Sequence, residues 1–290
     1  MANQQYLPTP LGHTLCSYWH EPQGAPRATV IIGAAIGIPQ SYYQTFAAWL
    51  AGEGFRVVTF DYYGHGESLQ GALRDVKCTL SDWAANDCAS VLEQAYQQLP
   101  EQPLYWVGHS LGGQIVPFIR GNEKITKLIT VACGSGYWKG NAKNTRLQAL
   151  LLWKLIMPSL IPLYGYFPGK KLKLIGDLPA NVARQWRRWC LNPRYAAGID
   201  AQHQAAYSRF VQPVVGLAFT DDEMISAANF HTLHQSFDQA PVELRFFDPA
   251  QFAQKRIGHL GFFRSQHQEG AWRQCLLPEL SPDTDLRQRA

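Results

Sequence analysis

The chain has 290 residues, 46% of them apolar, which is typical of a globular protein that buries a large core in one domain or in a domain with an insertion. Its net charge of +4 is unevenly distributed: residues 133–210 contain 12 Lys or Arg and two acids, so this segment carries +10 and the rest of the chain −6. The composition excludes a low-complexity or disordered chain.

The first half of the chain alternates short apolar strands with amphipathic helices. Two strands within 11–21 and 27–33 are joined by the turn Pro-Gln-Gly-Ala-Pro. Ser81 is placed to cap a helix from Asp82 to about Leu99. The other predicted elements are, in chain order, a helix over 41–51, a strand over 55–60, a strand over 104–107, a helix over 111–121 and a strand over 127–133.

The alternation breaks at Gly134 and resumes with strands over 214–220 and 242–247 and a helix around 263–277. Short apolar strands between amphipathic helices indicate a mostly parallel sheet covered on both faces. We therefore predict an α/β core made of residues 1–132 and 211–290, with 133–210 inserted. An insertion that follows a strand lies at the edge of the sheet where α/β proteins place their sites.

Targeting and cofactor signals are sparse. The six cysteines have neither CxxC nor metal-ligand spacing, so we expect free thiols in a reducing cytoplasm and no metal or organic cofactor. The first 14 residues have no basic start and no apolar core, so no signal peptide is expected. The most apolar window, 147–167, is interrupted by Lys154, Pro158 and Pro162, and we expect no transmembrane helix.

The pentapeptide Gly108-His109-Ser110-Leu111-Gly112 fits the pattern G-x-S-x-G. The pattern alone is weak, but an apolar strand runs into it and a helix follows, the context that a nucleophilic serine on a strained turn requires. Small residues two positions before and after the serine relieve the crowding of such a turn. The alternative is a glycine-rich start to a helix without chemistry.

A catalytic serine needs a base, and the base needs an acid that orients it. Among nine histidines, His259 lies in a glycine-flanked loop after the last strand, which ends at the same sheet edge as Ser110. Asp221 and Asp222 follow the strand over 214–220, and adjacent side chains near a strand end point in different directions, so one of them should face His259. The alternatives are an ordinary loop histidine and capping acids.

The negative charge that develops on a substrate carbonyl needs two backbone N–H donors. One is expected from Leu111, directly after the serine. The other is expected from the loop after the strand over 27–33, with Ala35 as the first choice and Ile36 as the next.

These motifs resemble those of α/β-hydrolases. Asp61 to Ser68 is similar to that family's D-x-R-G-x-G-x-S turn, although Tyr63 replaces the usual Arg, and Gly33-Ala34 replaces the usual His-Gly of the oxyanion loop. The chain order serine, aspartate, histidine is also that of the family. A closer resemblance is to bacterial predicted serine α/β-hydrolases of undefined substrate, through the segments at 188–195 and 257–264.

The resemblance implies an α/β-hydrolase sheet with 133–210 as an inserted helical cap, or lid. In the family pattern the acid stands four residues before a position often occupied by Pro, here Ser226, which selects Asp222 over Asp221. The implied activity is a serine hydrolase that cleaves an ester or thioester through Ser110, His259, Asp222 and an acyl-enzyme. The alternatives are an acyltransferase with the same triad and a non-catalytic binder of small molecules.

The composition of the inserted segment indicates which classes of substrate to expect. Its aromatic side chains either line an acyl pocket or form the core of the segment. Its basic clusters, Lys170 to Lys173 and Arg184 to Arg188, either attract a carboxylate, a phosphate or an anionic lipid, or are solvated. We expect an acyl substrate, with anionic and lipid-like molecules as candidates, no nucleic acid, and at most weak contact with a membrane surface.

Overall fold

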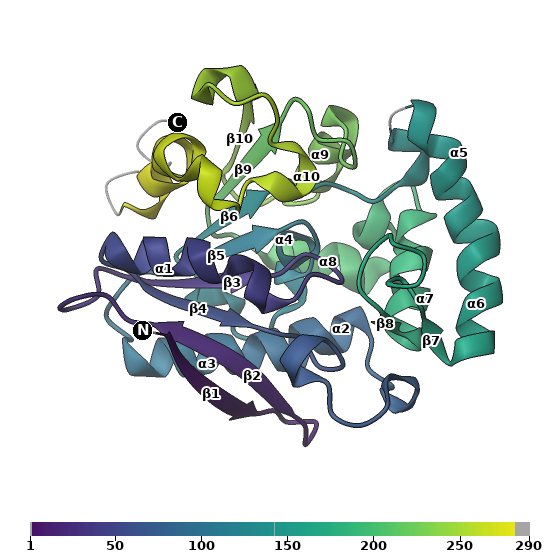
Figure 1. Cartoon of the computed structure of the whole chain (residues 1–290), viewed down its shortest axis with the longest axis horizontal. Helices are drawn as coiled ribbons and strands as arrows, with labels where there is room; N and C mark the ends of the chain where they lie inside the picture. Colours follow the sequence, from purple (N-terminus) through teal and green to yellow (C-terminus); the bar gives the residue numbers. More distant parts are fainter. Residues whose placement is uncertain (1, 142, 282–290) are drawn as a thin grey trace.

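The computed structural model describes residues 2–141 and 143–281, and its central feature is an eight-stranded sheet (Figure 1). The strand order is β1-β2-β4-β3-β5-β6-β9-β10, and all neighbours from β4 to β10 are parallel. The strands are β1 Ala2–Pro8, β2 Thr14–His20, β3 Thr29–Gly33, β4 Arg56–Phe60, β5 Leu104–His109, β6 Lys127–Val131, β9 Val214–Phe219 and β10 Val242–Phe247.

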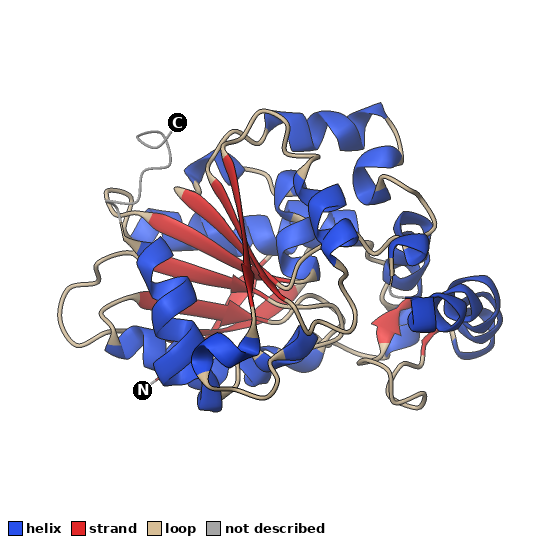
Figure 2. Ribbon diagram, turned by 90° about the horizontal axis from the view of Figure 1, so that it is seen from above, coloured by secondary structure: helices blue, strands red, loops and turns tan. Residues whose placement is uncertain are grey.

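The predicted mostly parallel sheet flanked by helices is confirmed, and Figure 2 shows helices on both of its faces. Every residue of β3, β5, β6 and β9 is buried, which explains their continuous apolar sequences. The main covering helices are α1 Gln44–Gly52, α3 Ala89–Gln98, α9 Ala227–His234 and the π-helical segment Gln268–Leu276.

The N-terminal hairpin differs from the prediction. Strand β2 pairs with β1 and with β4, both antiparallel, so the turn Pro-Gln-Gly-Ala-Pro does not close a hairpin between β2 and β3. Strand β1 was missed because it is an edge strand whose residues are mostly exposed, which leaves its sequence without an apolar pattern.

Two helices also differ in their boundaries. The helix over 80–98 begins with a capping box between Thr79 and Asp82, rather than at Ser81, and its Trp83–Cys88 turn is π-helical. The helix predicted over 111–121 ends early: α4 spans Leu111–Gln114, and a 3-10 turn, Val116–Phe118, follows. Pro117 lies in that turn and has no N–H with which to continue an α-helix.

Residues 133–210 form a mainly helical segment beside the sheet (Figure 1). Trp153 and Trp186 pack edge to face with ring centroids 4.8 Å apart, and Trp189 is fully buried against Phe118 and Tyr195. These aromatic rings therefore form the core of the segment and its contact with α4 and the turn after it. The elements are α5 Lys143–Leu151, η8 Leu152–Ile156, α6 Met157–Tyr164, β7 Tyr166–Phe167, β8 Leu178–Pro179, α7 Ala180–Cys190 and α8 Ala201–Arg209.

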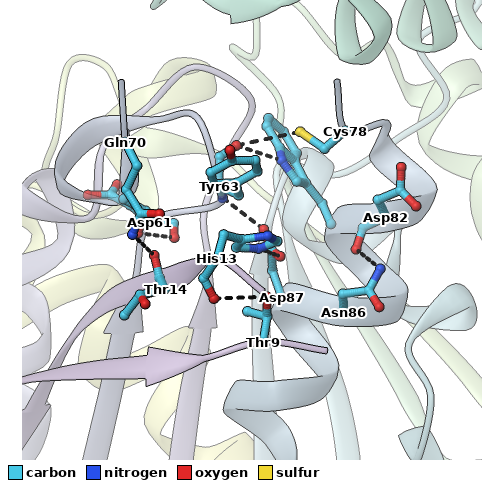
Figure 3. A network of polar contacts seen from close by, with 12 residues as sticks. Thr9, His13, Thr14, Asp61, Tyr63, Gln70, Cys78, Asp82, Asn86 and Asp87 are labelled. Atoms are coloured by element: carbon cyan, nitrogen blue, oxygen red, sulfur yellow. Dashed lines mark hydrogen bonds and ion pairs between the residues drawn. The ribbon is translucent and has the colours of Figure 1, made fainter. Parts of the chain in front are cut away.

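The turn after β4 is tied to the neighbouring helix by a buried polar network, shown in Figure 3. The Tyr63 N–H donates to Asp87 at 2.8 Å, and the other oxygen of Asp87 contacts His13 Nε2 at 2.8 Å. The rings of His13 and Tyr63 stack with centroids 3.9 Å apart. Tyr63, at the position where the family usually has Arg, thus joins the turn to the N-terminal hairpin and to Asp87.

Candidate active site

Ser110 connects β5 to α4 in a strained conformation, with φ 49° and ψ −115°. A Cβ atom on Gly108 would lie 2.4 Å from Cα of Gly113, and one on Gly112 would lie 2.1 Å from the carbonyl oxygen of Gly33. Glycine is therefore required at both positions, because other backbone segments pass where a side chain would be. This crowding holds the serine at the end of β5.

His259 lies in the short helix α10, Gly258–Gly261, and its side chain connects Ser110 to Asp222. Its Nε2 is 3.1 Å from Ser110 Oγ, and its Nδ1 is 2.9 Å from Asp222 Oδ2. The Asp222 side chain is buried, and because a carboxylate accepts hydrogen bonds, Nδ1 is assigned as the donor and Nε2 as the acceptor for the serine hydroxyl. The N–H groups of Met224 and Ile225 donate to the other carboxylate oxygen at 2.8 Å each.

The two neighbours of Asp222 hold the main chain around His259. Asp221 Oδ2 accepts from the N–H groups of Ile257 at 2.8 Å and Gly258 at 3.0 Å, and Glu223 Oε2 accepts from the N–H of His259 at 3.1 Å. The structure thus separates the two aspartates: Asp222 contacts the imidazole and Asp221 contacts only the backbone of the loop.

Glu223 also pairs with Arg256 at 3.2 Å. Partial burial works to raise the pKa of Glu223, but the hydrogen bonds from main-chain N–H groups and the Arg256 guanidinium outweigh it, and the pKa is held below its ordinary value. Glu223 is therefore ionised at neutral pH and carries a full charge beside the histidine loop.

Ala35, the first choice for the second oxyanion donor, has an internal partner in the structure. The Ala35 N–H already donates to the hydroxyl of Tyr43 at 2.9 Å inside the protein. By contrast, among the hydrogen bonds of the described residues, the N–H groups of Leu111 and Ile36 donate to no protein acceptor. Ile36 is the second choice from the sequence, and its N–H is the one that follows Ala35 along the chain.

Tyr43 and His109 link the oxyanion loop to the main chain of His259. The carbonyl of His259 can only accept, so His109 Nε2, 3.0 Å away, carries a proton and its Nδ1 is an acceptor. The Tyr43 hydroxyl, 2.8 Å from that Nδ1, therefore donates to His109 while it accepts from Ala35. Burial, with a smaller contribution from His259, lowers the pKa of His109 to about 3, so this imidazole stays neutral.

Tyr43 has no signal in the sequence, because nothing local distinguishes it from other apolar positions of the helix that follows β3. Asp221 was a candidate from the sequence for the side-chain contact with His259, and Glu223 has a sequence signal as the third of three consecutive acids that follow the strand over 214–220. Within the described ranges, no group of three or more His, Cys, Asp or Glu side chains could hold a metal ion, and the six cysteines are free and buried.

The fold and this arrangement of serine, histidine and aspartate define an α/β-hydrolase of the serine hydrolase class. The chain belongs to the family described as "Serine aminopeptidase, S33", which matches residues 24–185.

Among curated proteins the chain is similar to the monoglyceride lipases of Mus musculus and Homo sapiens, each 28% identical over 116 residues. That alignment covers 39% of this chain and only 34% of either lipase, so the chain matches about a third of the length of these relatives.

Two solved structures illustrate the likeness of fold. A soluble variant of monoglyceride lipase from Saccharomyces cerevisiae has a TM-score of 0.64 and 18% identity, with 86% of each chain covered. An esterase from Pyrococcus furiosus has a TM-score of 0.60 and 13% identity, covering 94% of this chain and 89% of the esterase. At these identities the likeness concerns the fold alone.

Proposed function

We propose that this protein hydrolyses a carboxylic ester or thioester through Ser110, His259 and Asp222. The observation that carries the proposal is the pair of contacts made by one imidazole, 3.1 Å to Ser110 Oγ and 2.9 Å to Asp222 Oδ2. These contacts give the serine a base and give the base an orienting acid, which together activate a hydroxyl that is otherwise a weak nucleophile.

In the first half of the reaction Ser110 Oγ bonds to the substrate carbonyl carbon while its proton passes to His259 Nε2. The C–O or C–S bond to the leaving group then breaks, and the leaving group takes that proton, which leaves an acyl-enzyme. In the second half a water molecule gives a proton to His259 and attacks the acyl carbon. The bond to Ser110 breaks, and Oγ recovers the proton.

The oxyanion of both steps is assigned to the N–H groups of Leu111 and Ile36. Support comes from the hydrogen bonds of the loop. The Ala35 N–H donates to the Tyr43 hydroxyl, whereas the Ile36 N–H has no acceptor among the described residues. A donor of this kind contributes about 3 kcal/mol to lowering the barrier. Leu111 also begins α4, so its N–H is one of the unpaired donors at a helix start.

Residues 133–210 are proposed as a cap over Ser110. Several contacts support this placement. Cys133 Sγ lies 3.0 Å from the carbonyl oxygen of Ser110, and the Tyr195 hydroxyl donates to the side chain of Gln114 at 2.8 Å. The Gly176 N–H also donates to the carbonyl of Gly37, in the loop after β3, at 3.1 Å.

The charge of this segment favours a neutral or anionic acyl substrate over a peptide with a free amino terminus. Residues 133–210 have a charge of +10, and the acids nearest the site, Asp221 and Glu223, are already engaged by the histidine loop. An aminopeptidase must instead place a negative charge against the α-ammonium group of its substrate. The partial likeness to monoglyceride lipases supports a lipid-like acyl group. The free, buried cysteines support the cytoplasm as the compartment.

A fluorophosphonate probe tests the proposal. The probe should label the wild-type protein at Ser110 and should leave Ser110→Ala unlabelled, with both proteins shown to be folded by circular dichroism. A folded wild-type protein that is not labelled would contradict the proposed hydrolase activity. A panel of p-nitrophenyl esters of increasing chain length, set against aminoacyl p-nitroanilides, then separates an esterase from an aminopeptidase. Product analysis with added alcohols detects acyl transfer.

A further inference from the structure

One helix of the inserted segment exposes an apolar face that nothing in the described chain covers. Helices α5 and α6 are joined through the π-helical turn η8 into a continuous helix over residues 143–164. Its stretch Thr145–Tyr164 is long and apolar enough to cross a membrane by length and composition: the most apolar 18-residue window has a mean hydropathy of 1.4, and only 17% of that window is buried. Lys154, Pro158 and Pro162 lie within this helix.

The exposed residues of this helix form a stripe. Leu147, Leu151, Leu155 and Leu163 are 74%, 47%, 58% and 73% exposed. The first three are spaced by four residues and are therefore neighbours on the helix surface, and Leu163 follows beyond the exposed Ser159. We call these four side chains the leucine face. Both ribbon views place the helix at the outer edge of the molecule, away from the central sheet (Figures 1 and 2). Isolated exposed leucines are ordinary, but several on one helix mark an interaction surface.

The opposite side of the same helix argues against a membrane span. Trp153, Met157 and Ile161 are buried there, with Trp153 packed on Trp186 of α7, and Arg187 of α7 donates to the carbonyl of Trp153. Crossing a bilayer would separate the helix from α7 and leave Lys154 in the hydrocarbon, where a charged side chain is costly. A helix with one face on its own protein and one apolar face outward is suited to lie in the plane of a membrane.

The positive charge around the leucine face indicates what kind of surface binds there. Lys170, Lys171 and Lys173 are exposed in the turn after β7, and Lys171 Nζ lies 4.6 Å from the ring centre of Tyr164 at the end of the helix. Two copies that met through this face would bring together two segments of charge +10, which repel each other. Anionic lipid headgroups would instead complement the lysines while the leucines enter the acyl boundary.

We propose that the leucine face rests on a membrane surface that contains anionic phospholipids, with the lysines of the turn after β7 on the headgroup phosphates. The helix thereby places the inserted segment, and with it the proposed cap, at the water–lipid boundary. For a hydrolase of lipid-like esters this is where the substrate is concentrated. The docking itself does not depend on the proposed reaction, and it is tested by binding alone.

The experiment is co-sedimentation of the full chain with preformed vesicles of phosphatidylcholine containing about a third phosphatidylglycerol, compared with pure phosphatidylcholine. Leu151→Gln combined with Leu155→Gln should weaken the partition into the mixed vesicles by about tenfold or more, because two apolar side chains no longer enter the lipid. Replacing Lys170, Lys171 and Lys173 by Gln should lower binding to the anionic vesicles and reduce its salt dependence.

The matched control replaces two exposed leucines elsewhere, Leu11→Gln with Leu69→Gln, and should bind like the wild type. All variants should retain turnover of a short soluble ester, which separates failure to dock from failure to fold or to catalyse. Three results would overturn the proposal: no sedimentation of the wild type, equal binding by the leucine-face variant, or a dimer in the absence of lipid that this variant dissociates. Retention in the membrane after alkaline carbonate would also overturn it, in favour of a span.

Discussion

Glu223 accepts a hydrogen bond from the main-chain N–H of His259 at 3.1 Å, directly beside Asp222, which binds the side chain of the same histidine. The carbonyl of His259 is held from the other side by His109 at 3.0 Å. The backbone of the proposed base is thus fixed on both sides of its Cα, and its imidazole is fixed at Nδ1. Glu223 is a positioning residue in this arrangement, since it acts on the histidine and not on a substrate.

Replacing Glu223 by Ala should lower kcat about tenfold with little change in KM, because a loosened His259 affects proton transfer more than substrate binding. Glu223→Gln should restore most of the rate, since an amide oxygen can still accept from the His259 N–H. Steady-state kinetics on a soluble ester measure both constants. Arg256→Gln is the control: its pair with Glu223 is exposed, so it should behave like the wild type. A matching loss in the Arg256 variant would contradict the role of the N–H contact.

Asp222→Asn and Asp221→Asn should differ sharply. Asparagine at 222 no longer stabilises the imidazolium and favours the wrong tautomer of His259, so kcat/KM should fall by about 10⁴. Asparagine at 221 keeps an oxygen that accepts from Ile257 and Gly258, and the loss should stay below about tenfold. Comparable losses in the two variants, at equal thermal stability, would mean that the aspartates are wrongly assigned.

Tyr43→Phe should reduce both stability and rate. The substitution leaves the Ala35 N–H and His109 Nδ1 without partners in a buried site, which costs about 1–3 kcal/mol of unfolding free energy. We also expect a lower kcat, because Ala35 then no longer anchors the loop that presents Ile36. Urea unfolding and ester kinetics measure the two effects. Tyr6→Phe, at a hydroxyl-bearing ring that is 62% exposed, serves as the control and should change neither.

His234 makes the stability of the fold depend on pH. Burial lowers its pKa from 6.5 to about 4, so below pH 6.5 the unfolded chain binds a proton that the folded chain does not. The free energy of unfolding is therefore unaffected by His234 above pH 6.5 and decreases as the pH falls towards 4, by up to about 1.4 kcal/mol per pH unit. Compared with the wild type, His234→Gln should therefore lose less stability between pH 6.5 and 4.5.

Urea unfolding at several pH values in this window measures the difference between the two proteins. Burial also lowers the pKa of His65 and raises the pKa of Asp61. The raised pKa of Asp61 changes stability with pH in the opposite direction to the lowered pKa of a histidine. Both groups are present in both proteins, so their contributions cancel in the comparison. Parallel stability curves for the two proteins would show that His234 is protonated in the folded state as readily as in the unfolded chain.

Much of the core could be predicted because its signals are local. Strands β3, β5, β6 and β9 are short apolar runs since they are buried on both faces, and the glycines around Ser110 are dictated by the turn itself. Strand β1 was not predicted because an exposed edge strand needs no apolar pattern. No boundaries were predicted for the helix over 143–164, whose packing against α7 is a tertiary contact that leaves no local pattern.

By itself the sequence determined the class of fold, the serine and the histidine, because strand-to-helix turns and strand ends leave local patterns of glycine and charge. The resemblance to the family favoured Asp222, but only the tertiary structure decided what each aspartate contacts and which main-chain N–H the Tyr43 hydroxyl engages. Adjacent residues at a strand end, or in one loop, have the same local environment in the sequence. They differ only in what other segments place against them, here the histidine loop in one case and the Tyr43 hydroxyl in the other.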